Sequence, residues 1–130
     1  MEAFINGFIS LGDPQLLLVL LVSTLGGVVI GALPGLNATN GAALLLPFTL
    51  SMEAIPAIAS LVAIYCSATF AGAITAILIN TPGTPASATT CLDGYPLAQR
   101  GEAGRALGLA VVSSTIGGVL SVICLMIAAP

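Results

Sequence analysis

The near absence of charged side chains is the feature that most constrains this chain. Between Asp13 and Glu53 lie 39 residues without a charge, and another 39 lie between Glu53 and Asp93. Each stretch is about twice as long as the roughly 20 apolar residues that one membrane helix needs. Soluble domains are about one quarter charged, whereas only 5% of this sequence carries charge. The sequence therefore predicts an all-α integral membrane fold with several spanning helices.

The composition also excludes several classes of function. The sequence contains no His, Lys or Trp, so the side chains that most often perform acid-base catalysis or bind metals are nearly absent. We therefore expect no enzyme, no metal centre and no organic cofactor. A net charge of -3 and an aromatic content of 5% provide neither a basic patch nor a stacking surface for nucleic acid. Cys66, Cys91 and Cys124 lack CxxC spacing, which favours free thiols over a disulfide or zinc site.

Three apolar runs are long enough to cross a membrane, at residues 15–33, 57–79 and 107–129. The first run, if helical, reaches about 28 Å, close to the thickness of the hydrocarbon core. Within it, Gly27 and Gly31 form a GxxxG pair that lets a second helix approach closely. The last run carries small and polar residues that favour helix packing, namely Ser113, Ser114, Thr115, Gly117 and Gly118.

The two ends of the chain carry further expectations. Residues 2–12 have apolar side chains at roughly helical spacing, which predicts a short helix lying in the membrane interface. They contain no Lys or Arg, so we do not expect a cleaved signal peptide. Because the chain stops directly after the run 107–129, we expect it to be the N-terminal part of a longer protein.

Pro-Gly pairs interrupt the hydrophobic pattern twice. In residues 34–50 a polar break precedes about ten apolar residues, too few to cross a bilayer. A re-entrant half-helix is the natural interpretation, and a second crossing with an unwound centre is the alternative. The second break covers residues 80–85 and is again followed by small and hydroxylated residues.

Residues 92–105 form the one hydrophilic stretch of any size and contain Arg100 and Arg105. Cytoplasmic loops are enriched in Lys and Arg, so we expect this stretch to be a cytoplasmic loop. Asp93, beside Gly94, is interpreted as a solvated turn residue rather than as an intramembrane proton carrier.

The two Pro-Gly breaks are the candidate functional site. Irregular backbone inside a membrane must be buried in protein or line a watery cavity, and transporters direct the N-terminal ends of half-helices at anionic groups. Thr39 or Asn40 can cap a half-helix after the first break. The pair Thr84 and Pro85 suits the start of a helix after the second. The alternatives are ordinary proline kinks and, for the asparagines, hydrogen bonds between helices. The candidate substrate-binding or ion-binding residues are Pro34, Gly35, Asn37, Thr39, Asn40, Asn80, Thr81, Pro82, Gly83, Thr84 and Pro85.

Three uninterrupted stretches are also familiar. They are PGLNATNGAALLLPFTLSM at residues 34–52, AILINTPGTPASATTCLDGYPLAQRGEAGRALGLA at residues 76–110, and the SSTIGG that follows. Together they resemble the large membrane subunit of the tripartite tricarboxylate transporters, over nearly the whole chain. The two Pro-Gly signatures of that family match Pro34, Gly35, Asn37 and Thr39 in the first break and Asn80, Thr81, Pro82, Gly83, Thr84 and Pro85 in the second.

The resemblance implies a multi-pass permease of the bacterial inner membrane that takes up citrate or other carboxylates, driven by a gradient of sodium ions or protons. It also implies two protein partners, a small membrane subunit and a periplasmic solute-binding protein. Two other functions stay open: a pore-forming subunit, and a scaffold that assembles a membrane complex through its GxxxG faces without transporting anything itself.

Overall fold

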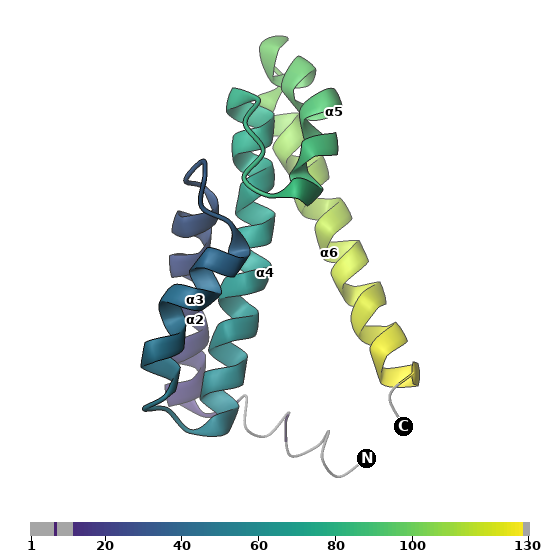
Figure 1. Cartoon of the computed structure of the whole chain (residues 1–130). Coiled ribbons are helices and arrows are strands. Elements are labelled where there is room, and N and C mark those ends of the chain that lie inside the picture. Colours follow the sequence, from purple (N-terminus) through teal and green to yellow (C-terminus); the bar gives the residue numbers. More distant parts are fainter. Residues whose placement is uncertain (1–6, 8–11, 129–130) are drawn as a thin grey trace.

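The computed structural model describes residue 7 and residues 12–128, and this part of the chain contains helices and no strands. The helices are α2 (Pro14–Gly31), α3 (Ala38–Thr49), α4 (Ala54–Ile79), the short 3-10 helix η1 (Pro85–Ser87), α5 (Ala88–Gln99) and α6 (Ala103–Ala128) (Figure 1). The predicted interfacial helix at residues 2–12 falls almost entirely outside the described residues.

Three of these helices, α2, α4 and α6, are long and apolar enough to cross a membrane. With 18, 26 and 26 residues they extend over about 27 to 39 Å. The fold is therefore an all-α membrane fold, as the scarcity of charge predicted. α4 begins before the predicted start at residue 57 because Pro56 lies in its first turn, where proline needs no hydrogen-bonding N–H.

Two glycines let α2 and α4 pack backbone to backbone. A Cβ added to Gly27 would lie 2.7 Å from the carbonyl oxygen of Ile64, and one added to Gly31 would lie 2.6 Å from the Cα of Ala68. The predicted GxxxG face is thus confirmed as a helix-packing surface. Because the contact advances by four residues on both helices, α2 and α4 run in the same direction.

The chain must therefore return from the end of α2 to the start of α4, and residues 32–53 carry it back (Figure 1). α3 runs alongside both long helices, with Gly41 facing Ile30 and Ile64. This direction favours the alternative of a second passage over a half-helix that enters and leaves at one end.

The second break behaves differently, because it folds back along α4. α4 ends at Asn80, whose left-handed backbone has a φ of 55°. The N–H of Gly83 then donates to the carbonyl of Gly72 at 3.4 Å, about 10 Å below the end of α4. α5 returns toward that end, with Gly94 against Ile77. Residues 80–99 thus enter and leave on the same side (Figure 1).

The predicted loop at residues 92–105 is wrong in its secondary structure. α5 continues to Gln99, and a turn with Gly101 at a φ of 83° leads into α6 at Ala103. No residue of α5 is buried, so the helix can be as polar as an exposed loop. Composition alone therefore did not distinguish a helix from a loop at these residues. At the start of α6, Arg105 Nη1 donates to Glu102 Oε2 at 2.9 Å in an exposed ion pair.

α6 diverges from the other helices along its length (Figure 1). Ala106, near its start, is buried, whereas every residue from 111 to 128 is exposed. The small and polar face predicted on this span has no helix packed on it within the part of the chain that the structure describes.

Candidate functional site

The first break is a turn followed by a capped helix. Pro34 and Gly35 are exposed, and Gly35 has a φ of 95°, which a side chain would strain. Asn37 caps α3, its Oδ1 accepting a hydrogen bond from the backbone N–H of Asn40 at 2.9 Å. The predicted cap, Thr39 or Asn40, is therefore wrong. Both lie in the first turn of α3 and are exposed, because the helix begins at Ala38 rather than after them.

The second break places its polar side chains at two depths. Asn80, Thr81 and Pro82 are exposed, whereas Thr84 is buried. Thr84 Oγ1 and Ser87 Oγ share a buried hydrogen bond of 2.8 Å in which either oxygen can donate. Thr84 and Pro85 occupy the N-cap and first position of η1, as predicted, although the Thr84 side chain makes no capping bond and the α-helix begins only at Ala88.

The second break packs on the C-terminal end of α2, where three glycine backbones touch. A Cβ added to Gly83 would lie 2.8 Å from the Cα of Gly72 and 2.9 Å from the carbonyl oxygen of Gly31. Gly31 is the last residue of α2, so this contact lies three residues before the first break. We call Gly31, Gly72 and Gly83 the glycine junction. The need for glycine at position 83 is thus explained by the approach of protein backbone, which the sequence did not predict.

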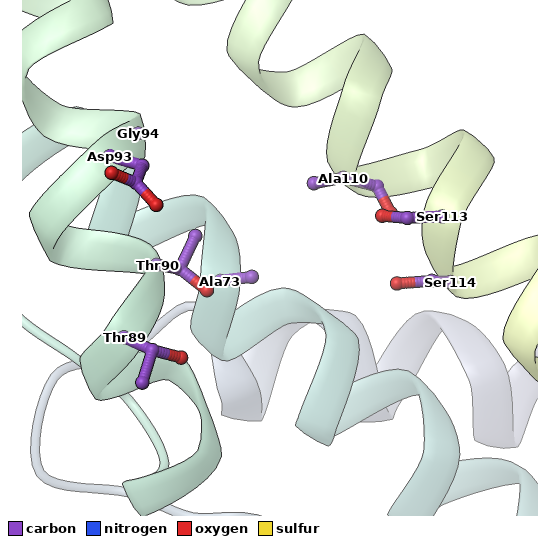
Figure 2. A pocket seen from close by; sticks show the side chains of 8 residues that line it. All are labelled: Ala73, Thr89, Thr90, Asp93, Gly94, Ala110, Ser113 and Ser114. Atoms are coloured by element: carbon purple, nitrogen blue, oxygen red, sulfur yellow. The ribbon is translucent and has the colours of Figure 1, made fainter.

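A polar hollow between α4, α5 and α6 is a second notable feature, and the sequence did not predict it. Its volume is about 330 Å³ (Figure 2). The lining residues are Ala73, Thr89, Thr90, Asp93, Gly94, Ala110, Ser113 and Ser114. Asp93 is exposed, as expected, but it lies within α5 and not in a turn. On a helix, positions 89, 90 and 93 share one face. The sequence predicted a loop from residue 92 onward, so this shared face was not predicted.

The oxygens of the hollow are largely free of protein partners. Ser113 Oγ donates to the carbonyl of Leu109 at 2.7 Å, and Thr89 Oγ1 makes only a long contact of 3.4 Å to the carbonyl of Ala86. Within residues 12–128, no side-chain hydrogen bond occupies Thr90, Asp93 or Ser114. Figure 2 shows the hydroxyls of Ser113 and Ser114 directed across the gap toward α5.

Two comparisons with known proteins found matches. Residues 17–130 match the model of the tripartite tricarboxylate transporter TctA family. The chain is also 42% identical over 109 residues to a protein of Agrobacterium vitis named "Uncharacterized 52.8 kDa protein in TAR-I ttuC' 3'region". This match covers 84% of the chain and 22% of that protein, so the chain spans about one fifth of the length of this curated relative. No solved structure matches the chain.

Proposed function

This chain belongs to the tripartite tricarboxylate transporter TctA family, and we propose that it forms part of a permease subunit that takes up tricarboxylates or related carboxylates. The resemblance found in the sequence is thereby confirmed at the level of the family. We place the permease in the bacterial inner membrane, with an ion gradient as its energy source.

The family description, a tripartite transporter, implies further subunits. We propose that these are a small membrane subunit and a periplasmic solute-binding protein that delivers the carboxylate. The remaining length of the permease would complete the membrane domain, since the chain covers 22% of its relative.

The packing of the second break on the end of α2 at the glycine junction is the observation that carries the proposed site. It brings Gly83 of the second break against Gly31, three residues before the first break. No charged side chain lies between Asp13 and Glu53 or between Glu53 and Asp93, so both breaks present uncharged polar groups. A carboxylate gains about 0.3 to 1 kcal/mol at a helix N-terminus, and up to about 2 kcal/mol where partly buried. We propose that the exposed groups at positions 34, 35, 39, 40 and 80–82 face the substrate.

A scaffold function has less support, because its main sequence argument was the GxxxG face. Gly27 and Gly31 already pack against α4 of the same chain, so this face is not available to an external partner. We therefore propose transport and not assembly as the function.

Uptake by the complete transporter tests this function. Full-length permease and its small subunit are reconstituted in vesicles with the solute-binding protein outside, and an inward sodium or proton gradient is imposed. We expect saturable accumulation of a radiolabelled carboxylate, starting with citrate, above its external concentration. Equilibration without accumulation indicates a pore, and the absence of movement for every short di- and tricarboxylate contradicts the proposal.

A further inference from the structure

We propose that Thr84 and Ser87 are positioning residues for the second break. Their buried hydroxyls, hydrogen-bonded to each other on the surface of α4, hold the exposed residues 80–82 in place. The part of this inference that concerns carboxylate binding rests on the proposed function. The part that concerns the placement of the break does not.

The hydroxyl pair lies against a glycine of α4. A Cβ added to Gly72 would lie 3.2 Å from Ser87 Oγ, and equally 3.2 Å from Cγ2 and the backbone nitrogen of Thr84. Glycine at position 72 therefore leaves the space in which both side chains lie. The N–H of Gly83, the residue before Thr84, donates to the carbonyl of Gly72 at 3.4 Å. Several groups of residues 83–87 thus meet α4 at the same glycine.

The two hydroxyls satisfy each other. Thr84 and Ser87 are only 8% and 4% exposed, and a buried hydroxyl without a partner is costly. Their side-chain oxygens are 2.8 Å apart, and the backbone N–H of Ser87 also donates to the carbonyl of Thr84 at 3.0 Å. Because the side-chain bond and the backbone bond join the same two residues, together they fix the turn that follows Gly83.

This turn is one of two attachments that flank the exposed residues 80–82. At one end, the N–H of Thr81 donates to the carbonyl of Thr75 at 3.3 Å, near the end of α4. At the other end, Gly83 and the turn after it lie on Gly72. Loosening the turn weakens the second attachment, so the polar groups of residues 80–82 lose a fixed position.

Thr75 can report whether the break stays in place. A Cβ added to Gly83 would lie 3.5 Å from Thr75 Oγ1, and Thr75 is only 8% exposed. In the test, Thr75→Cys is introduced into full-length permease that lacks other cysteines, and the purified protein reacts with a small thiol reagent in detergent. The double variant Thr84→Val with Ser87→Ala should react severalfold faster, because local opening of the break uncovers the thiol.

The double variant also separates positioning from stability. Either single substitution leaves one buried hydroxyl unpaired and should lower the melting temperature, whereas the double variant removes both hydroxyls and should melt nearer the wild type. With Thr75 restored, its affinity for a radiolabelled carboxylate, beginning with citrate, should still fall about fivefold, equivalent to one neutral hydrogen bond. Thr84→Ser keeps the hydroxyl and should recover most of that affinity.

Matched controls on α4 remove hydroxyls that bond their own helix. Ser60 is 1% exposed and its Oγ donates to the carbonyl of Ala57 at 2.8 Å. Thr69 Oγ1 donates to the carbonyl of Tyr65, also at 2.8 Å. Ser60→Ala and Thr69→Val should therefore change neither the reaction rate of the reporter thiol nor the affinity for carboxylate.

The inference is wrong if the double variant folds normally and its reporter thiol reacts as slowly as that of the parent protein. It is also wrong if the parent binds carboxylate and the double variant binds it with unchanged affinity. If the double variant fails to fold, Gly72→Ala carries the test, since it crowds the pair without removing a hydroxyl and should also speed the reaction. A permease that binds no carboxylate contradicts the proposed function, whereas a faster reaction in the double variant would still support the placement of the break.

Discussion

Adjacent glycines in α2 have opposite surroundings. The Cβ position of Gly27 is occupied by Ser67 and by backbone of α4, whereas that of Gly26 has nothing within 4 Å. The sequence identified the packing pair correctly, because small residues four apart have few other uses in a membrane helix. The packing role of Gly83 was not predicted, because it depends on the backbone of Gly31 and Gly72, which are distant in the sequence. The prediction that Asp93 lies in a turn was also wrong, because α5 is as polar as a loop.

Alanine at these neighbouring positions should have different effects. Gly27→Ala forces α2 and α4 apart and should destabilise the protein by about 1 to 3 kcal/mol, the usual cost of overpacking. Gly26→Ala should be neutral or stabilising by up to about 1 kcal/mol, since alanine is the better helix former. Thermal unfolding of the full-length protein in detergent measures both. Equal melting temperatures for the two variants would refute the described packing of α2 on α4.

At the scale of the element, α3 shows what the sequence could and could not determine. Polar residues before an apolar run predicted a helix start with a side-chain cap, and a cap is present. Which of Asn37, Thr39 and Asn40 supplies it depends on backbone angles that a single sequence does not reveal. The direction of α3 depends on the parallel pairing of α2 with α4, which is a contact between distant parts of the chain.

Removal of the cap should weaken α3 by a predictable amount. Asn37→Ala loses the bond to the N–H of Asn40 and should cost about 1 kcal/mol, within a range of about 0.5 to 2 kcal/mol. Asn37→Asp keeps an accepting oxygen and should cost less. Unfolding midpoints in urea or detergent provide the comparison. Asn40→Ala is the control, because only its backbone takes part in the cap, and a larger loss there than at Asn37 would be inconsistent with this assignment.

At the scale of the whole molecule, membrane residence and the number of long helices follow from the sequence, because charge is costly in lipid and the uncharged stretches are long. The path of the chain did not follow, since hydropathy carries no information about helix direction. The parallel pair α2 and α4 implies that the start of α2 and the end of α3 lie on one side of the membrane. The connection between α5 and α6, which carries Arg100 and Arg105, lies on the opposite side of the membrane, and we propose that this is the cytoplasmic side.

Cysteine labelling tests this arrangement in intact cells. Single cysteines at Gln15, Ser51 and Glu102 are introduced into full-length protein from which Cys66, Cys91, Cys124 and any other native cysteines have been removed. A membrane-impermeant thiol reagent added outside should label positions 15 and 51 and spare position 102. Labelling at position 51 with protection at position 15 would instead support a re-entrant half-helix in residues 34–50, which enters and leaves the membrane on one side. Rapid labelling at position 102 would reverse the proposed orientation.

The central claim is that the two Pro-Gly breaks, the second of which packs on the end of α2 at the glycine junction, bind the carboxylate. Its most direct test is the affinity of purified full-length permease for radiolabelled carboxylates, beginning with citrate. In the variant Asn40→Ala with Thr81→Val, two exposed polar groups are removed without touching the junction. Hydrogen bonds to a charged group contribute about 1.5 to 3 kcal/mol, so binding should weaken at least tenfold, equivalent to about 1.4 kcal/mol. The control Ser51→Ala, at the far end of α3, should bind like the wild type. Unchanged affinity in the double variant, with normal folding, would contradict the claim and place the carboxylate site outside these breaks.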